Sequence, residues 1–334
     1  MKAVLLECFG AADKAFRTIE FPTPEINDEE ILIKVKATSI NPIDYKIRSG
    51  YLPHLVPAFP AILHGDVSGI VACLGKNVKG FQIGDYVYGC IGGVMGIGGA
   101  SAEYTKADYR LLSKIPENID VYDAATIPLA GITAYEAIFQ RAPIQPGQKV
   151  LIYGGVGGVG HFAVQFAKVL GAEVYATVSS EQQAVIAQKL GADHTINYKK
   201  ETVADFKARY TNGKGFDFVF DTIGNQNLKN SFEAVRIKGT VVTTVSLDTI
   251  DLSPIHEKAL AFHTVYMIIP ILYNDQTGKT EHGRILHQIG ELITQGKVKP
   301  LIDEKKFSLN EIAKAHEYAE KARNMGKIVV TING

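Results

Sequence analysis

The spacing of hydrophobic and polar positions changes near residue 123. Before that point, short apolar runs alternate with turns rich in Gly, Pro, Asn and Asp. Short runs divided by turn residues are typical of the strands of a compact, barrel-like sheet. The clearest runs are residues 2–6, 30–37, 69–74, 85–88 and 110–114. The pattern therefore predicts a β-rich N-terminal domain.

Beyond residue 123 the apolar spacing alternates between that of strands and that of helices. Helices are predicted over residues 124–140, 181–190, 202–210 and 227–235, and strands over 173–178, 195–197, 216–221 and 239–245. Alternating strands and helices form a parallel sheet that helices cover on both faces. This part of the chain is therefore predicted to be a doubly wound α/β domain.

The chain beyond Leu260 has a less regular pattern. Residues 261–273 fit an edge strand followed by an apolar loop, residues 283–295 and 309–322 fit helices, and residues 328–332 fit a final strand. An exposed apolar edge strand tends to associate unless it is covered. The apolar side chains of residues 262–273 are Phe262, Tyr266, Met267 and Tyr273 among others. They predict a homodimer contact along this edge, with a cover from the same chain as the alternative.

A glycine-rich turn lies between a short apolar run and a helical pattern. Its residues Gly155, Gly157 and Gly160 fit G-x-G-x-x-G between a predicted strand and a predicted helix, which is the context that dinucleotide binding requires. The glycines permit a tight turn, close approach of a pyrophosphate, and packing of the helix on the strand. The helix N-terminus adds N–H groups and a partial positive charge. The motif predicts a cofactor bound at Gly155 and at the backbone of Gly157, Gly158 and Val159; a purely structural turn is the alternative.

Composition narrows the class of protein. A length of 334 residues favours two domains. Lys plus Arg and Asp plus Glu both number 35, so no net charge favours nucleic acid or an anionic membrane as a partner. Three cysteines cannot all pair in disulfides, which favours a reducing compartment. With no signal-peptide pattern and no apolar stretch of membrane-spanning length, we expect a cytoplasmic protein.

Several motifs, in order along the chain, carry a resemblance to a known family. They lie at residues 40–44, 64–71, 84–87, 153–160, 191–193 and 326–330. Together they resemble the medium-chain dehydrogenase/reductase superfamily, and within it the zinc-independent, quinone oxidoreductase-like (zeta-crystallin-like) branch. The resemblance implies a GroES-like β-barrel catalytic domain formed by residues 1–123 and 269–334. It also implies a Rossmann domain with a doubly wound parallel sheet over residues 124–268.

The zinc ligands of related alcohol dehydrogenases have no counterpart at the corresponding positions. In those enzymes a Cys, a His-Glu pair and a second Cys hold the catalytic metal. In this chain the position of the first Cys aligns with Asn41 and its neighbours, and the His-Glu pair aligns with Gly65 and Asp66. The position of the second Cys falls near Leu129. A structural zinc site needs four clustered ligands, usually thiolates, and the chain has only three cysteines. We therefore expect no metal, and we expect His64 to be a hydrogen-bonded histidine of a loop or the interior.

The expected absence of zinc limits the chemistry, because a metal would otherwise acidify a bound alcohol. What remains is hydride delivery from a reduced nicotinamide to an electrophile, a quinone or an α,β-unsaturated carbonyl compound. That step depends on positioning and on a dry pocket. The first alternative is a zinc-free alcohol dehydrogenase or aldehyde reductase. The second is a non-catalytic nucleotide- or RNA-binding protein on the same fold.

The resemblance also implies roles for single residues. Asn41 lines the nicotinamide and substrate pocket, Thr133 lies near the nicotinamide ribose and ring, and Tyr51 lies beside the substrate, where it can orient or protonate it. Lys327 is a basic residue near the cofactor. Asp44 holds the loop of Asn41 through hydrogen bonds of the Asx type. Each role has a structural alternative. Tyr51 would lie in a half-buried strand, Thr133 would bond to the backbone of its own helix, and Lys327 would be a solvated residue at a strand end.

The end of the second Rossmann strand bears on the choice of cofactor. An NAD site places Asp or Glu about twenty residues beyond the glycines to bind the ribose 2′-OH. This chain has Ser179 and Ser180 there, which leave room for a 2′-phosphate, and Tyr198 and Lys199 resemble a pair that closes on it. Gln183 stands where related reductases often have Lys, so fewer charges would face the phosphate. NADPH is favoured over NADH. Further cofactor contacts are expected at Thr222, Gly224, Val245 and Ser246.

Overall fold

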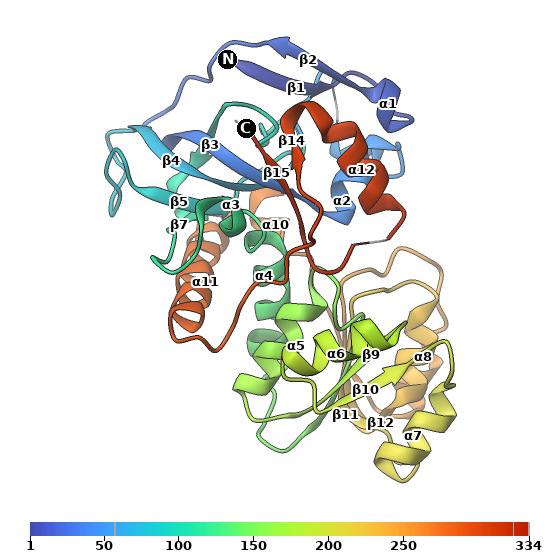
Figure 1. Cartoon of the computed structure of the whole chain (residues 1–334). Coiled ribbons are helices and arrows are strands. Elements are labelled where there is room, and N and C mark those ends of the chain that lie inside the picture. Colours follow the sequence, from blue (N-terminus) through green and yellow to red (C-terminus); the bar gives the residue numbers. More distant parts are fainter. Residues whose placement is uncertain (57, 323, 333–334) are drawn as a thin grey trace. The chain divides into compact units, whose positions relative to one another are not determined.

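The computed structural model describes residues 1–56, 58–322 and 324–332, which form two compact units (Figure 1). Unit 1 comprises Met1–Ile132, Ile268–Gly296 and Ile302–Gly334. Unit 2 comprises Thr133–Met267 and Lys297–Leu301. The sequence prediction divides the chain at residue 123 instead, and it has no return of a short C-terminal segment to unit 2.

Unit 1 is organised around a mixed sheet. Within the described residues its strand order is β14-β15-β3-β4-β5-β7, with β6 paired to β3. The strands are β3 (Glu30–Ile40), β4 (Asp66–Leu74), β5 (Tyr86–Cys90), β6 (Tyr104–Asp108), β7 (Leu112–Lys114), β14 (Phe307–Ser308) and β15 (Ile328–Thr331). Two more strands, β1 (Lys2–Leu6) and β2 (Phe16–Glu20), form a separate antiparallel pair.

The long strand β3 shows why this sheet forms. Ile31, Ile33 and Val35 are fully buried and alternate with more exposed residues, as the two-residue period of a strand requires. They join one apolar core with residues of β4 and β5, such as Val71 and Val87. β3 carries the chain directly to Asn41, so this packing fixes the backbone that leads into the candidate site.

Helices of 4 to 19 residues complete unit 1. They are α1 (Ala12–Ala15), α2 (Pro42–Arg48), α3 (Val121–Ala124), α10 (Ile269–Leu272), α11 (Gln276–Thr294) and α12 (Ile312–Glu320), with 3-10 turns at Pro53–Leu55, Tyr109–Leu111 and Leu309–Glu311. The helix α11 begins at Gln276, earlier than the predicted residue 283, because Asp275 caps it by accepting from the Thr277 N–H at 3.0 Å. Gly283, the first residue of the predicted range, lies inside the helix and lets it approach the Arg110 carbonyl: a Cβ there would lie 2.5 Å from that oxygen.

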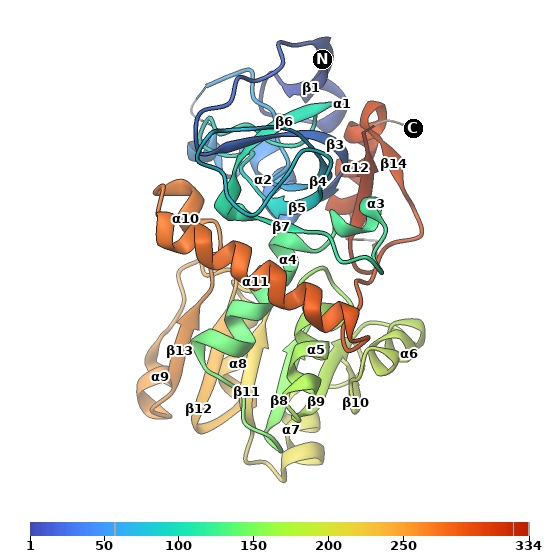
Figure 2. The same cartoon turned by 90° about the vertical axis from the view of Figure 1, so that its left-hand side faces the viewer.

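Unit 2 is a doubly wound parallel sheet. Among the described residues its strand order is β10-β9-β8-β11-β12-β13, with every pair parallel. The strands are β8 (Lys149–Tyr153), β9 (Glu173–Val178), β10 (His194–Asn197), β11 (Phe216–Asp221), β12 (Val235–Thr243) and β13 (Ala261–Thr264), and Figure 2 shows them side by side. The helices are α5 (Gly160–Val169), α6 (Glu181–Lys189), α7 (Val203–Thr211), α8 (Asn227–Ala234) and α9 (Ser253–Glu257).

The order of the strands places the candidate site. The chain moves outward from β8 to β10 and then returns to the other side of β8 with β11. Ligands of such sheets bind beyond the C-terminal ends of the strands where this reversal occurs. The end of β8 is the glycine-rich turn, so the reversal and the motif coincide.

Several predicted boundaries differ from the structure. The predicted helix over residues 124–140 is divided into α3, then α4 (Pro128–Tyr135), then a π-helical turn at Glu136–Arg141. The apolar run at 110–114 is a 3-10 turn followed by the short β7. After β13 the chain forms the short helix α10 rather than an apolar loop. In each case the apolar pattern is present, but local turns divide it.

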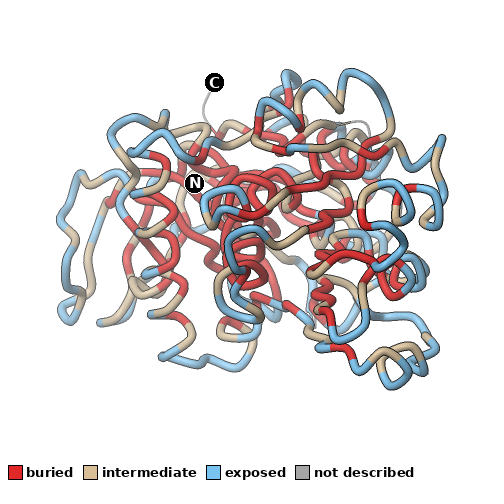
Figure 3. The backbone as a smooth tube through the Cα atoms, turned by 90° about the horizontal axis from the view of Figure 1, so that it is seen from below, coloured by how far each residue is buried: buried red, intermediate tan, exposed pale blue. Residues whose placement is uncertain are grey.

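Buried residues run along the strands of both units, and exposed residues gather in the connecting loops (Figure 3). The core of unit 2 contains Tyr175, Phe216 and Phe232, all nearly or fully buried. Of the helices in the described ranges, none combines the length and the apolar composition that a crossing of a bilayer needs.

Candidate functional site

The glycine-rich turn of unit 2 is closed by backbone hydrogen bonds. The N–H of Gly155 donates to Thr177 O at 3.2 Å, and that of Gly157 donates to Gly154 O at 2.8 Å. A Cβ on Gly160 would lie 2.0 Å from Gly154 O, and one on Gly155 would lie 2.6 Å from the Ala176 Cβ. Only glycine fits these two positions, because a larger residue would displace the turn.

The same turn presents donors at the start of α5. Within the described residues, no backbone carbonyl accepts a hydrogen bond from the N–H groups of Gly158 and Val159. Val159 is the residue just before α5, and no side chain caps the helix there. Free N–H groups and the helix dipole together favour an anion. The turn therefore fits the pyrophosphate of a dinucleotide, which it would hold by these two N–H groups.

Ser179 and Ser180 lie directly after β9 and are held by one side chain. Gln183 Oε1 accepts from the Ser179 N–H at 2.8 Å and from Ser179 Oγ at 2.9 Å. The Gln183 N–H donates to Ser180 Oγ at 3.2 Å, which caps α6. The end of β9 thus presents neutral hydroxyl groups in place of a carboxylate.

Tyr198 and Lys199 follow β10, the strand next to β9. Because β10 pairs in parallel with β9, and Asn197 lies opposite Val178, these two residues lie at the same edge of the sheet as Ser179. The Tyr198 side chain is 56% exposed, and the Lys199 N–H donates to Asn197 Oδ1 at 3.1 Å. The structure thus brings both predicted pairs to the ends of neighbouring strands.

On the other side of β8, the ends of β11 and β12 lie close together. Thr222 Oγ1 donates to Tyr153 O at 2.7 Å, which ties β11 to β8 just before the glycines. Gly224 has φ +72°, and a Cβ there would lie 2.2 Å from Val245 O. Ser246 follows Val245 in the same loop. All four predicted residues of these strand ends therefore border the same edge as the glycine-rich turn.

Asp221 organises this edge, and the sequence analysis did not identify it. The buried carboxylate accepts from the N–H groups of Ile223 and Gly224 at 2.9 and 2.8 Å, and from the side chains of Asn227 and Ser231 at 3.0 Å each. It thereby fixes the turn that holds Thr222 and Gly224. The available signal was an Asp at the end of a strand whose other residues, apart from Asp217, are apolar.

Unit 1 contains a second candidate, a buried polar network formed by Ser39, Asn41, Asp66 and Lys327. All four side chains are at most 3% exposed. Asp66 Oδ2 accepts from Ser39 Oγ at 2.6 Å, from Asn41 Nδ2 at 2.7 Å and from Lys327 Nζ at 3.3 Å. Asp66 Oδ1 accepts from the Leu129 N–H at 2.8 Å. The alternative of a solvated Lys327 is therefore wrong: its ammonium is enclosed.

Asp44 supports the loop of Asn41 and is itself buried. It lies in the first turn of α2, and its Oδ2 accepts from the Asn41 N–H at 2.7 Å. The pKa of Asp44 is raised to about 7, mainly by burial and further by the nearby Asp66 carboxylate, against the opposing effects of the Asn41 hydrogen bond and Lys327. Asp44 thus holds the loop of Asn41, through a capping box at the start of α2 rather than through the expected Asx-type hydrogen bonds.

His64 and His316 form a buried pair in the same unit. Their Nε2 atoms lie 2.9 Å apart, and both side chains are fully buried. The pKa of His64 is lowered to about 3, mainly by burial and in addition by Lys327. The pKa of His316 is lowered well below its usual value by burial first and then by the neighbouring His64 and Arg48. Both rings are therefore neutral near pH 7. His64 lies in the interior, hydrogen-bonded, as expected.

Tyr51 and Thr133 are placed differently from each other. Tyr51 follows α2 in a bend and is 54% exposed, so the alternative of a half-buried strand is wrong. Thr133 lies within α4 and is 5% exposed. Thr133 belongs to unit 2, whereas Asn41 and Tyr51 belong to unit 1.

The donor set of unit 1 does not fit a zinc ion. Asp66, the only carboxylate at the aligned positions, already accepts four hydrogen bonds, one from the Lys327 ammonium. Across residues 1–56, 58–322 and 324–332, no group of three or more His, Cys, Asp or Glu is placed to hold a metal.

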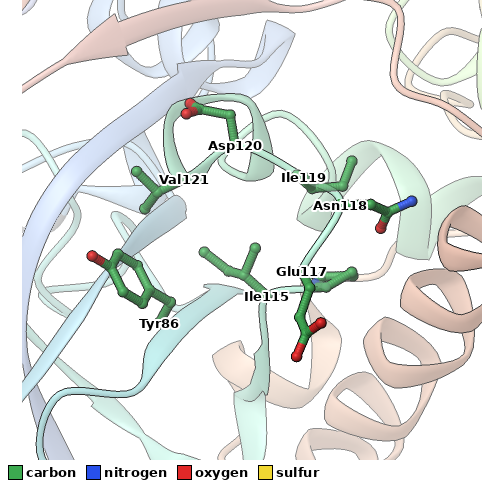
Figure 4. Close-up of a pocket in the computed structure, with 8 residues that line it drawn as sticks. Tyr86, Ile115, Glu117, Asn118, Ile119, Asp120 and Val121 are labelled. Carbon is green, nitrogen blue, oxygen red and sulfur yellow. The ribbon is translucent and has the colours of Figure 1, made fainter.

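A hollow on unit 1 lies apart from these residues. It has a volume of about 600 Å³ and is lined by residues 115–121 and Tyr86 (Figure 4). Figure 4 shows the side chains of Glu117, Asn118 and Asp120 around its rim. None of the predicted site residues lines it, so it adds nothing to the assignment of the site.

Comparisons with known proteins agree with this architecture. Residues 27–117 match the family described as alcohol dehydrogenase GroES-like domain, and residues 190–330 match the family described as zinc-binding dehydrogenase. The chain is 32% identical to the NADPH-dependent alkenal/one oxidoreductase, chloroplastic, of Arabidopsis thaliana, over 99% of this chain and 79% of that protein.

Solved structures show the same fold. An alcohol dehydrogenase superfamily protein from Novosphingobium aromaticivorans is 36% identical, with a TM-score of 0.93 over 100% of both chains. The Escherichia coli quinone oxidoreductase complexed with NADPH is 27% identical, with a TM-score of 0.88 over 99% of this chain and 100% of that one. These similarities confirm the predicted fold, a GroES-like domain with a parallel-sheet Rossmann domain.

Proposed function

The chain belongs to the medium-chain dehydrogenase/reductase superfamily and is an oxidoreductase, and from that premise we propose that it uses NADPH, without a metal ion, to reduce quinones or α,β-unsaturated carbonyl compounds. The observation that carries the proposal is the glycine-rich turn at the start of α5, with its free N–H groups beside the hydroxyl-bearing end of β9. The names of the relatives support it, since they include an NADPH-dependent alkenal/one oxidoreductase and a quinone oxidoreductase bound to NADPH.

The residues of unit 2 would hold the cofactor in distinct ways. The N–H groups of Gly158 and Val159 would bind the pyrophosphate. Ser179, at the neutral end of β9, would leave space for a 2′-phosphate, where a carboxylate would repel it. Tyr198 and Lys199 would approach that phosphate from the end of β10. When bound, NADPH supplies the hydride.

In unit 1, the proposed contribution is to position and polarise the electrophile. Asn41 suits this role, because its amide can donate a hydrogen bond to a carbonyl oxygen without adding charge. A conjugated carbonyl or a quinone is already electrophilic, so a hydrogen bond and a fixed position suffice for hydride addition. The hydride would add to the conjugated carbon, the electrons of the double bond would move toward the carbonyl oxygen, and a proton from water would complete the reduction.

Steady-state rates with three substrates test the proposal. Purified protein is given NADPH with a 1,4-quinone, NADPH with a linear enone, and NADP⁺ with a primary alcohol. We expect turnover of the quinone or the enone that exceeds that of the alcohol by at least tenfold, about 1.4 kcal/mol in transition-state free energy. Turnover of the alcohol alone would overturn the proposal in favour of a zinc-free alcohol dehydrogenase. RNA binding at moderate salt without any turnover would favour the non-catalytic alternative.

We also propose that β13 pairs with β13 of a second copy in a homodimer. Among the strands of the described residues, β13 pairs with β12 on one side and with no strand on the other, so that edge offers backbone groups for pairing. Charges on an edge strand block such pairing. The double substitution Ala261→Glu and Thr264→Lys, at two exposed positions of β13, is expected to give a monomer by light scattering. Val185→Lys, on the exposed surface of α6, is the control that should leave the dimer intact. A wild-type monomer would contradict the proposal.

A further inference from the structure

Lys327 has no donor left for a phosphate. Its ammonium donates to Ile40 O at 3.0 Å, to Asn41 Oδ1, and to Asp66 Oδ2 at 3.3 Å. An ammonium has three N–H groups, so all of them are used within unit 1. The side chain is 3% exposed, which also separates the charge from solvent. The role of a cofactor-binding cation, expected from the sequence, does not fit this geometry.

We infer that Lys327 is a positioning residue that, together with Asp66, fixes the Asn41 amide so that one N–H is presented to a carbonyl oxygen of a bound ligand. The inference rests on the proposed function for the identity of that ligand. The carbonyl oxygen belongs either to the carboxamide of the reduced nicotinamide or to the electrophile, and the experiment below separates these two sources.

The chemistry of the two neighbours allows only one orientation of the Asn41 amide. An ammonium can only donate, so the oxygen Oδ1 must face Lys327. A carboxylate only accepts, so Nδ2 must face Asp66, at 2.7 Å. The flipped amide would place N–H groups against the ammonium and its oxygen against the carboxylate. The assignment of N and O, usually uncertain for Asn, is therefore determined here by charge.

The amide retains one unused donor. Of the two Nδ2 hydrogens one is bound to Asp66, and among the described residues no acceptor is recorded for the second. Asn41 is 2% exposed, and a buried donor without an acceptor is costly, so such groups usually meet a ligand or water. The backbone N–H of Asn41 donates to Asp44 Oδ2 at 2.7 Å, which fixes the backbone from which the side chain extends.

The ligand group that this arrangement recognises is a neutral acceptor. A donor held between a cation and an anion is aligned before the ligand arrives, so the hydrogen bond strengthens as negative charge develops on a carbonyl oxygen during hydride addition. A phosphate is disfavoured, because the Asp66 carboxylate lies directly behind the donor. Lys327 therefore acts through Asn41 and not on the ligand itself.

The first experiment compares Lys327→Met with Lys321→Met, an exposed lysine at the end of α12. We expect Lys327→Met to lower kcat at least tenfold and to leave the dependence of the NADPH Kd on salt unchanged, with any rise in Kd no larger than that of Asn41→Ala. Lys321→Met should change neither quantity. A tenfold or larger rise in the Kd for NADPH, with a weaker salt dependence, would show that Lys327 binds the cofactor phosphates and would overturn the inference.

A second variant covers the case in which Lys327→Met does not fold. The double variant Lys327→Met with Asp66→Asn removes both charges, so no unpaired charge stays buried. It is expected to unfold at a higher temperature than either single variant and still to have a low kcat, because the amide is no longer held in one orientation. A wild-type kcat in this double variant would overturn the inference.

The third variant, Asn41→Ala, identifies the ligand oxygen. A rise of about tenfold in the Kd for NADPH would assign the donor to the nicotinamide carboxamide; a loss of kcat/KM for the enone at unchanged Kd would assign it to the electrophile. Unchanged values for both would overturn the inference. If the wild-type protein binds NADPH but reduces no acceptor, the proposed reaction fails, and the Kd measurements on Asn41→Ala and Lys327→Met still decide the inference.

Discussion

In unit 2 the groups that we propose bind a ligand are backbone N–H groups, at Gly158 and Val159, whereas in unit 1 the proposed group is a side chain, the Asn41 amide. The backbone groups are placed by the shape of a turn that only glycines permit. The amide is placed by two opposite charges, Lys327 and Asp66, that are buried beside it. One site therefore depends on steric fit and the other on electrostatic balance.

The difference predicts different weaknesses. A turn built from glycines contains no desolvated charge, so it should withstand changes of pH and fail when a methyl group is added. A buried ion pair should tolerate small changes of shape and fail when one charge is removed, because the remaining charge stays in a medium of low polarity. The four predictions that follow test this contrast, from the largest expected effect to the smallest.

Removing one charge from unit 1 should have the largest effect. Asp66→Asn leaves the Lys327 ammonium buried without its counter-charge, which typically costs about 3–5 kcal/mol of the free energy of unfolding. The measurement is urea unfolding at pH 7. The control is Asp28→Asn, which breaks an exposed pair with Lys76 at 2.7 Å and should cost less than about 1 kcal/mol. Equal costs for the two variants would contradict an electrostatic role for Asp66.

Adding a methyl group to the turn of unit 2 should come next. Gly160→Ala places a Cβ where it would lie 2.0 Å from Gly154 O, so the turn must open and its N–H groups lose their alignment. The affinity for NADPH should fall by about a hundredfold, about 2.7 kcal/mol, as measured by fluorescence titration. Gly98→Ala, where a Cβ has nothing within 4 Å, should bind NADPH normally. Normal binding by Gly160→Ala would show that the turn is not the cofactor site.

The buried groups of unit 1 should make stability depend on pH. The pKa values of His64 and His316 are lowered in the folded chain. Below pH 6.5 the unfolded chain therefore binds two protons that the folded chain does not bind, so the free energy of unfolding decreases as the pH is lowered. Asp44 opposes this, because its pKa, raised to about 7, lets the folded chain hold a proton that the unfolded chain releases above about pH 4. The net slope between pH 4 and 5.5 should be about 1.4 kcal/mol per pH unit, with stability lower in acid.

The variant His316→Gln removes one of the two histidines from that balance. It should reduce the slope in this window to near zero, whereas His256→Gln, at an exposed position of α9, should leave the slope unchanged. Urea unfolding at half-unit steps of pH measures both. An undiminished slope in His316→Gln would mean that groups elsewhere in the chain control the acid sensitivity.

The smallest effect should appear at the end of β9. Ser179→Asp introduces a carboxylate beside the expected 2′-phosphate, so the Kd for NADPH should rise about tenfold and the preference should move toward NADH, about 1.4 kcal/mol. Gln188→Glu adds the same charge at an exposed position of α6 and is the control. If Ser179→Asp leaves the ratio of the two affinities unchanged, the phosphate lies elsewhere.

The accuracy of the sequence predictions also differs between the two units. In unit 2 the strands over residues 173–178 and 216–221 were predicted with the bounds that the structure shows, because short-range spacing determines them. The glycine-rich turn was also found, because its parts adjoin one another in the chain. Asp221 was missed, because its partners become visible only when the turn after β11 is folded.

In unit 1 the contacts that matter join distant parts of the chain. Lys327 meets Asp66 across 261 positions, and His64 meets His316 across 252. No local pattern marks such partners, so Lys327 was expected to face the cofactor or the solvent. The structure shows a buried lysine instead, because β15 pairs with β3 and brings Lys327 next to Asn41.

We propose that hydride transfer in this protein needs no metal: the Asn41 amide, fixed by the buried Lys327 and Asp66, lies at a position that aligns with a zinc ligand. The most direct test measures NADPH-dependent reduction of an enone or a quinone and the zinc content of the same sample, before and after dialysis against a chelator. The account predicts the same rate in both samples with far less than one zinc per chain. A rate that falls with the zinc content and returns when zinc is added back would contradict it.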